Sequence, residues 1–284
     1  MRLLPIIQSI YILGDIGYFG LPLIKLIDNF RFDVSLNDNR VILLGDNFYP
    51  EGIKVNDDKQ WVDYEIAFRD IPYKRVNAVM GNHDYMGDPN IQLKTKYFEN
   101  NEFYYKRPLL NFDLFFLDTV PLYKGHCYIN DKMITDIHGT SSSVLKNRQL
   151  EWLKDELEKT EKLGRRKIVF GHYPVLSNGF YHNDLNPMYK SLMPIFEKYK
   201  VDAYISGHEH NIQYINRKIS ESYRFHQFIM GSSSENRQDE FYNIFHNDFY
   251  DNQEQYFLQL YEKEGQLIFN FKNRYNVVKH LFII

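Results

Sequence analysis

Five short segments of this chain end an apolar run with glycine followed by side chains that can bind a metal ion. They are Gly-Asp at 14–15, Gly-Asp-Asn-Phe-Tyr at 45–49, Gly-Asn-His-Asp at 81–84, Gly-His at 171–172 and Gly-His-Glu-His at 207–210. One Gly-Asp pair alone is usually a turn, and one histidine alone is usually structural. Ligands of α/β proteins bind beyond the carboxyl ends of strands, so five such segments in order favour a shared metal site.

The donors in these segments are too many for a single ion. Six are strong candidates and a tyrosine is a seventh: Asp15, Asp46, Asn82, His172, His208, His210 and Tyr49. This number suits two ions roughly 3.5–4 Å apart that share a bridging carboxylate, an arrangement found in hydrolytic enzymes. His208 and His210 alternate along an extended segment, which would point them to opposite sides. A turn after Gly207 could direct each of them to a different ion.

Tyr49 raises a separate question, because a phenol titrates near pH ~10 in water and is a poor metal ligand while protonated. It can ligate only if a strongly charged cation displaces its proton. The alternative is an aromatic side chain that packs beside the strand end.

The segments that carry these donors alternate between strands and helices. We expect strands over 9–15, 40–46 and 75–82, with helices over 21–30 and 59–70 between them. The same order returns with a helix at 147–163, a strand at 167–172, a helix at 189–199 and a strand at 201–210. Alternating buried strands and helices predict βαβ units with a parallel sheet, and therefore an α/β fold.

The remaining chain is expected to add strands and two loops. Residues 113–120 predict a strand, the C-terminal third predicts antiparallel strands, and the closing VVKHLFII predicts a final strand in the core. Residues 123–145 and 231–254 are polar and predict long loops. The chain has no evident linker, so residues 1–284 are predicted to form a single domain.

Composition narrows the classes of partner. A net charge of −3 argues against a nucleic-acid-binding protein, and no apolar stretch approaches the ~20 residues of a membrane span. Cys127 is the only cysteine, which excludes an internal disulfide, and there is no Asn-x-Ser/Thr sequon. The apolar N-terminus is interpreted as the first buried strand rather than a signal peptide. We therefore expect an intracellular, cytoplasmic monomer that binds neither nucleic acid nor membranes.

The ordered motifs GDIG, GDNFYPEG, GNHD, GHYPVLS and GHEHNIQY resemble those of the calcineurin-like metallophosphoesterases. Within these, the chain is similar to purple acid phosphatases of the tartrate-resistant type, which FLDTV (116–120) and QLEWLKDEL (149–157) also match. The resemblance runs from about residue 9 to residue 215 and implies a four-layer αββα sandwich of two mixed sheets flanked by helices. The first motif departs from the family's usual GDWG, because Ile16 replaces a large aromatic residue.

The resemblance also implies which residues share an ion. One ion takes Asp15, Asp46, Tyr49 and His210, and the other takes Asp46, Asn82, His172 and His208. The first set carries more negative charge if Tyr49 is a phenolate, which suits Fe(III). The second set suits a divalent ion such as Fe(II), Zn or Mn.

The function implied is that of an acid phosphatase, a phosphoric monoester hydrolase that uses a metal-activated hydroxide. Its substrate would be a phosphorylated small molecule or a phosphoprotein. His83 resembles the family's histidine that donates a proton or contacts phosphate, although it could simply order its loop. His182 lies roughly where a second substrate-facing histidine is expected. Asp84 could accept a hydrogen bond from a ligand histidine or cap its own loop.

Two alternatives remain at this point. A phosphodiesterase or nucleotide pyrophosphatase with two divalent ions would use the same fold, but it would not need Tyr49. A catalytically inactive scaffold would keep the fold to bind a partner. That interpretation requires lost ligands, and none of the seven is missing.

Overall fold

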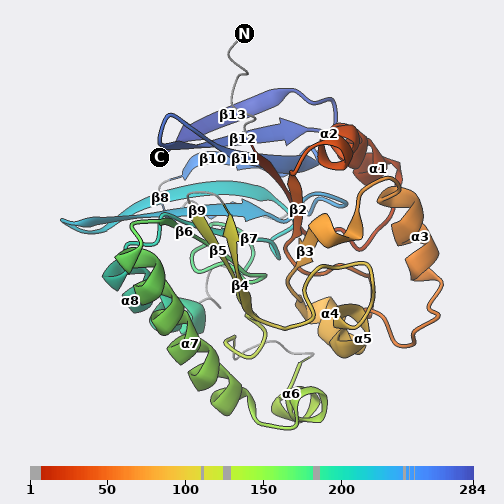
Figure 1. The fold of residues 1–284 in the computed structure, drawn as a ribbon, viewed down its shortest axis with the longest axis horizontal. Coiled ribbons are helices and arrows are strands. Elements are labelled where there is room, and N and C mark those ends of the chain that lie inside the picture. The colour runs from red at the N-terminus through yellow and green to blue at the C-terminus, as the bar shows by residue number, and fades with distance from the viewer. Residues whose placement is uncertain are drawn as a thin grey trace.

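The structure, a computed structural model, describes residues 8–109, 112–123, 129–181, 186–238, 241, 242, 244, 245 and 247–284. Two mixed β-sheets form its centre (Figure 1). The first has the strand order β13-β12-β11-β1-β2-β3, in which β1, β2 and β3 are parallel. Its strands are β1 (Ser9–Leu13), β2 (Arg40–Leu43), β3 (Val76–Ala78), β11 (Tyr256–Lys263), β12 (Gln266–Asn273) and β13 (Val278–Ile283).

The second sheet has the order β10-β8-β9-β7-β6-β5-β4, with β5, β6, β7 and β9 parallel. Its strands are β4 (Tyr105–Leu109), β5 (Phe112–Phe116), β6 (Arg166–Phe170), β7 (Ala203–Ser206), β8 (Ile212–Ser220), β9 (Tyr223–Met230) and β10 (Asn247–Asp251). The helices are α1 (Leu21–Asp28), α2 (Arg31–Leu36), α3 (Gln60–Ala67), the 3₁₀ turn η1 (Tyr73–Arg75), α4 (Asn82–Met86), α5 (Pro89–Leu93), α6 (Asp131–His138), α7 (Ser142–Lys162) and α8 (Asn186–Lys198).

The two sheets pack against each other because their strands are apolar on both faces. In β1, Ile10 and Ile12 face the core between the sheets, whereas Tyr11 and Leu13 face the core beneath the helices. Phe228 of β9 stacks on Phe269 of β12 with ring centroids 4.2 Å apart, which joins the sheets directly. A strand buried on both faces needs a continuous apolar run, as the sequence provides.

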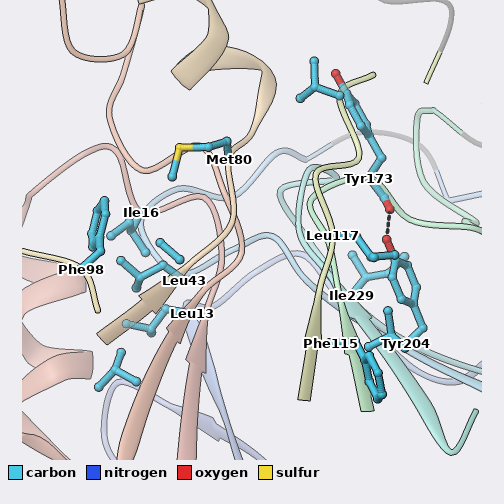
Figure 2. Close-up of a cluster of buried hydrophobic side chains, with 14 of the residues drawn as sticks. Leu13, Ile16, Leu43, Met80, Phe98, Phe115, Leu117, Tyr173, Tyr204 and Ile229 are labelled. Carbon is cyan, nitrogen blue, oxygen red and sulfur yellow. Dashed lines mark hydrogen bonds between the residues drawn. The ribbon is translucent and has the colours of Figure 1, made fainter. Parts of the chain in front are cut away.

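Helices cover the outer face of each sheet. Helices α1, α2 and α3 lie beside the first sheet, and α7 and α8 lie beside the second (Figure 1). Leu153 and Leu157 of α7 belong to the same buried cluster as Phe115 of β5. Figure 2 shows members of this cluster from both sheets, including the hydrogen bond from the Tyr204 hydroxyl to the Tyr173 carbonyl. The αββα sandwich expected from the family resemblance is confirmed.

Several local predictions were wrong. The final strand β13 is an edge strand that pairs only with β12, and most of its side chains are exposed rather than in the core. The predicted loop at 123–145 contains α6 and the start of α7, and the predicted loop at 231–254 contains β10. The strands of the C-terminal third pair antiparallel with one another as predicted, and β9 also pairs in parallel with β7 of the preceding part of the chain.

Among the described residues, no helix is both long enough and apolar enough to cross a bilayer. The intracellular location and the single domain stay predictions. Cys127 lies outside the described residues.

Candidate metal centre

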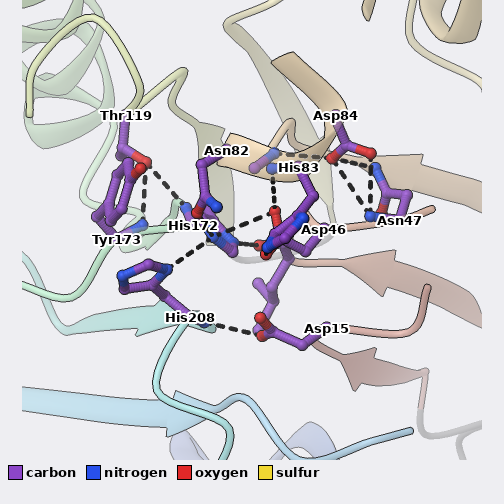
Figure 3. A network of polar contacts seen from close by, with 12 residues as sticks. Asp15, Asp46, Asn47, Asn82, His83, Asp84, Thr119, His172, Tyr173 and His208 are labelled. Atoms are coloured by element: carbon purple, nitrogen blue, oxygen red, sulfur yellow. Dashed lines mark hydrogen bonds and ion pairs between the residues drawn. The ribbon is translucent and has the colours of Figure 1, made fainter. Parts of the chain in front are cut away.

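The carboxyl ends of the parallel strands of both sheets converge on one buried site. Asp15 follows β1 by two residues, Asp46 follows β2 by three, and Asn82 opens α4 just after β3. From the second sheet, His172 follows β6 and His208 follows β7 by two residues each. Figure 3 shows these five side chains converging from both sheets. The expected convergence of the ends of β1, β2 and β3 is therefore present.

The backbone is strained at four of the predicted ligands. Asp15, Asp46, His208 and His210 have φ values of 56°, 50°, 74° and 50°, in the left-handed region that side chains other than glycine rarely adopt. Each such residue costs on the order of 1–3 kcal/mol, and such residues cluster at functional sites. The left-handed conformation of His208 and His210 also provides the turn after Gly207 that could direct the two rings to different ions.

Two glycines are needed because the carboxylates come very close to the backbone. A Cβ on Gly81 would lie 2.1 Å from Asp46 Oδ1, and one on Gly207 would lie 2.4 Å from Asp15 Oδ2. Heavy atoms that are not bonded cannot approach so closely, so any larger residue would displace a carboxylate.

Asp15, Asp46 and His210 form one group whose ligand atoms all lie within 4.8 Å of one another. His210 Nε2 is 3.5 Å from Asp15 Oδ1. The Tyr49 oxygen joins this group at 3.2 Å from Asp15 Oδ1, 3.3 Å from Asp46 Oδ2 and 3.0 Å from His210 Nε2. Tyr49 does more than pack beside the strand, because its hydroxyl lies close to all three candidate ligands.

Asp46, His172 and His208 form a second group within the same limit, so Asp46 belongs to both groups. His172 Nε2 lies 3.5 Å from Asp46 Oδ1, 3.1 Å from Asn82 Oδ1 and 3.2 Å from His208 Nδ1. Its other nitrogen, Nδ1, is 2.9 Å from the Leu44 carbonyl oxygen. A carbonyl can only accept, so Nδ1 carries the proton and Nε2 presents its lone pair to the group.

The pKa shifts in the first group show that its acidic side chains favour their protonated forms when no cation is bound. Burial, followed by the charge of Asp46, raises the pKa of Asp15 well above its ordinary value. Burial and the charges of Asp46 and Asp15 likewise raise the pKa of the Tyr49 phenol. Burial lowers the pKa of His210 to about 4, so it is neutral and supplies no positive charge. Two buried carboxylates and a phenol within hydrogen-bonding distance fit a multivalent cation, which would favour their ionised forms.

His83 and Asp84 lie beside the two groups. The His83 amide donates to Asp46 Oδ1 (2.9 Å), and its ring Nε2 is 4.0 Å from Asp46 Oδ2. The His83 ring is 29% exposed, so a substrate can reach it. Asp84 is buried and accepts from the amides of Gly81 (2.8 Å) and Asn47 (3.1 Å). Among the described residues its partners do not include a histidine, so Asp84 orders the loop.

The sequence did not single out Arg237, which lies over the first group. Its amide donates to the His210 carbonyl (2.9 Å), and its guanidinium donates to the Tyr181 hydroxyl (3.1 Å). The Tyr181 ring packs on His208 with centroids 4.3 Å apart. Burial is the main cause of the lowered His210 pKa, and the positive charge of Arg237 lowers it further. The available signal was that Arg237 is the only cation in the run SSSENRQDE. His182, the other predicted catalytic histidine, lies outside the described residues.

Comparison with known proteins shows that this chain belongs to a family of phosphoesterases. The family described as calcineurin-like phosphoesterase matches residues 9–211. Tartrate-resistant acid phosphatase type 5 of Sus scrofa is 30% identical over 64% of this chain and 55% of its own length. The Homo sapiens protein of that name is 32% identical over 62% and 56%, respectively. Purple acid phosphatase 4 of Arabidopsis thaliana is 29% identical over 75% and 65%. The chain thus spans little more than half of the length of its tartrate-resistant relatives.

Solved structures support the fold alone, because their sequence identity is low. The purple acid phosphatase from yellow lupin (Lupinus luteus) seeds has a TM-score of 0.71 and 17% identity over 98% of this chain and 53% of that chain. GAP50, described as the anchor in the inner membrane complex of Plasmodium, has a TM-score of 0.72 and 20% identity over 97% and 88%. A dimetal phosphatase from Danio rerio has a TM-score of 0.63 and 14% identity over 98% of both chains.

Proposed function

We propose that this chain, which belongs to the calcineurin-like phosphoesterase family, is a metal-dependent hydrolase of phosphate monoesters. The observation that carries the proposal is the pair of ligand groups that share Asp46. Similarity to tartrate-resistant and purple acid phosphatases supports a monoester rather than a diester as substrate. A phosphorylated small molecule or a phosphoprotein fits this class.

The two groups would each hold one ion. We assign Fe(III) to Asp15, Asp46, Tyr49 and His210, and a divalent ion (Fe(II), Zn or Mn) to Asp46, Asn82, His172 and His208. This division is supported by the contacts of Tyr49 and Asn82, since the Tyr49 oxygen approaches the first group and the Asn82 oxygen approaches the second. When bound, the two ions would act as Lewis acids toward phosphoryl oxygens and supply a nucleophile near neutral pH.

Of the side chains that the structure describes, His83 is the best placed to protonate the leaving alcohol. Its Nδ1 is hydrogen-bonded to the Pro50 carbonyl, which fixes the ring and leaves Nε2 facing the Asp46 carboxylate. Because the Pro50 carbonyl can only accept, Nδ1 carries a proton, and the ring holds a second proton on Nε2 only as an imidazolium. In that form Nε2–H would lie at the edge of the metal centre and would donate its proton to the leaving oxygen. General acid catalysis of this kind contributes typically ~10²–10⁴-fold.

Arg237 would contact the phosphate from the opposite wall. Its guanidinium is held over the rings of Phe180 and Tyr181, at 5.9 and 5.6 Å from their centroids. Guanidinium groups bind phosphate oxygens in a planar, bidentate manner. We therefore assign Arg237 a role in binding the substrate rather than in the chemical step.

Hydrolysis assays on iron-loaded protein test this proposal. We expect turnover of p-nitrophenyl phosphate that exceeds turnover of bis(p-nitrophenyl) phosphate. Asp46→Asn should abolish it, whereas Asp155→Asn, which changes an exposed carboxylate on α7, should not. Faster hydrolysis of the diester would favour a phosphodiesterase. Two bound ions without turnover of either ester would favour an inactive scaffold.

A further inference from the structure

Thr119 is a buried side chain that holds the backbone of a candidate ligand. Its Oγ1 accepts from the amide of His172 at 3.1 Å and from the amide of Tyr173 at 3.0 Å (Figure 3). A hydroxyl oxygen has two lone pairs, so both hydrogen bonds can form at once. Thr119 and His172 are both 0% exposed, so these amides depend on the Thr119 oxygen rather than on water.

The segment that carries Thr119 is itself fixed by helix α7. The main chain of Asp118 is bound to the Gln149 side chain: its amide donates to Oε1 and its carbonyl accepts from Nε2, both at 2.8 Å. The Thr119 carbonyl accepts from the amides of Leu122 and Tyr123, each at 3.1 Å. The Thr119 hydroxyl therefore extends from a backbone that is anchored before and after it.

A second buried side chain holds the segment around His172. The Tyr204 hydroxyl donates to the Tyr173 carbonyl at 2.6 Å (Figure 2). Glycine is needed at position 171, because a Cβ on Gly171 would lie 2.5 Å from the Tyr204 oxygen and 2.6 Å from Thr119 Cγ2. The two side chains thus pack so closely on this segment that they leave no room for a larger residue there.

These contacts give the His172 imidazole one defined position. Its Nδ1 donates to the Leu44 carbonyl, which sets the orientation of the ring, and Thr119 holds its backbone amide. The His172 carbonyl accepts from the Gly207 amide at 3.0 Å, which connects it to the segment that carries His208. Thr119 therefore acts through His172 on the second group of candidate ligands.

We propose that Thr119 is a positioning residue that sets the affinity for the divalent ion assigned to Asp46, Asn82, His172 and His208. This rests on the proposed function, because it needs that ion. Metal–ligand distances in proteins tolerate only about ±0.2 Å, so a small shift of the His172 backbone would weaken a bond to its Nε2. Mutation of side chains that orient a metal ligand typically costs ~10–100-fold in metal affinity.

The effect should be confined to one of the two groups of ligands. In the described part of the chain, the hydrogen bonds of Thr119 Oγ1 do not extend to Asp15, Tyr49 or His210. The charge-transfer band that we expect from Tyr49 and iron should therefore persist when Thr119 is altered. A loss of affinity restricted to the divalent ion distinguishes positioning of His172 from general damage to the fold.

Zinc titration of protein that already carries iron at the first group tests the proposal, with a chromophoric chelator as the competitor. Thr119→Val keeps the shape of the side chain but places a methyl group where the oxygen lies 3.1 and 3.0 Å from two amide nitrogens. Non-bonded carbon atoms prefer roughly 3.5–4.0 Å from their neighbours, so residues 172–173 must move away. Zinc affinity should fall ~10–100-fold, with the purple band unchanged at equal iron content. Thr119→Ser restores the oxygen and should bind zinc nearly as tightly as the wild type.

A further variant and a control separate positioning from folding. Thr119→Ala removes the same oxygen without adding a contact, so it should show the same loss of zinc affinity if Thr119→Val does not fold. Thr160→Val is the matched control, because Thr160 is also 0% exposed and its hydroxyl donates to Asp113 Oδ2 at 2.7 Å rather than toward a candidate ligand. It should lower the free energy of unfolding and leave zinc affinity unchanged.

Equal zinc affinity in the wild type and in the folded variant without the Thr119 oxygen would overturn the proposal and leave the two-ion centre in place. The proposal is also overturned if Thr119→Ser loses as much affinity as Thr119→Val, or if Thr160→Val does so at a similar loss of stability. A wild type that holds iron but no zinc would instead overturn the dinuclear centre, and the positioning role with it.

Discussion

Replacing Arg237 with methionine removes a positive charge from the wall of the metal centre while keeping a long apolar side chain. The backbone contact of Arg237 with the His210 carbonyl should persist, because it uses the main-chain amide. The variant loses the contact of the guanidinium with Tyr181. It also loses the positive charge that we expect to bind the phosphate. The variant therefore isolates the electrostatic contribution of one residue that the sequence alone did not indicate.

The expected magnitude follows from how the guanidinium is placed. Hydrogen bonds to charged groups contribute ~1.5–3 kcal/mol when well shielded from water. Arg237 is partly exposed, which screens the interaction toward the lower limit. A loss of about 1.5 kcal/mol corresponds to roughly a tenfold decrease in kcat/KM. Because the interaction is with bound phosphate, most of the decrease should appear as a higher KM, and the inhibition constant of inorganic phosphate should rise similarly.

Steady-state hydrolysis of p-nitrophenyl phosphate at several salt concentrations measures this effect. Arg217→Met is the matched control, because Arg217 is an exposed arginine over an aromatic ring, 5.1 Å from the Phe245 centroid. The wild type should lose kcat/KM with added salt more steeply than Arg237→Met. An unchanged KM in Arg237→Met, or an equal decrease in Arg217→Met, would refute the assignment.

Three further perturbations have defined outcomes. Tyr49→Phe keeps the ring but removes the oxygen that contacts Asp15 and Asp46. At equal iron content, the variant should therefore lose the purple charge-transfer band of aerobically iron-loaded protein. A variant that stays purple would show that Tyr49 is not a ligand. Gly81→Ala should displace the Asp46 carboxylate and lower metal occupancy at both sites in elemental analysis. Gly20→Ala is the control and should not lower it, because its Cβ would lie 3.5 Å from the nearest atom. Equal occupancy in the two variants would contradict the close approach of the Asp46 carboxylate to Gly81. Burial raises the Asp118 pKa from 3.8 to about 7, so the folded chain keeps a proton there that the unfolded chain loses in between. The free energy of unfolding of the wild type relative to Asp118→Asn should therefore fall by at most about 4 kcal/mol as the pH rises from about 4 to 7. Urea unfolding at matched metal content measures this difference. A difference that does not change with pH would contradict the raised pKa.

The sequence predicted the strands that position the candidate metal centre because their signals are local. Each apolar run ends in glycine and a polar donor, and parallel strands place such ends at one edge. The turn after Gly207 was also foreseeable, and the left-handed φ values at His208 and His210 show how it separates the two rings.

Other elements were missed although local signals were present. Helix α6 begins after Asn130, whose side chain accepts from the Met133 amide, and ends at Gly139 with φ 69°. An asparagine N-cap and a left-handed glycine are ordinary helix boundaries, so the predicted loop at 123–145 could have been divided. Strand β13 was placed in the core because its residues are apolar. Which strand lies at the edge of a sheet depends on long-range pairing, which composition does not reveal.

The residues that contact the candidate ligands from outside the five motifs could not be predicted from the sequence. Arg237 donates to the His210 carbonyl from a loop without regular structure, and Thr119 accepts from the His172 amide across 53 positions of the chain. Neither Arg237 nor Thr119 belongs to one of those motifs. Their roles follow only from the three-dimensional contacts.

Metal stoichiometry in Asp46→Asn tests the central claim most directly, because Asp46 belongs to both ligand groups. Elemental analysis after saturation with iron and a divalent ion should give two ions per wild-type chain. Asp46→Asn should lower occupancy at both sites, whereas His210→Ala should mainly lower the first and His172→Ala the second. One ion per wild-type chain, or Asp46→Asn with unchanged occupancy, would contradict the shared dinuclear centre.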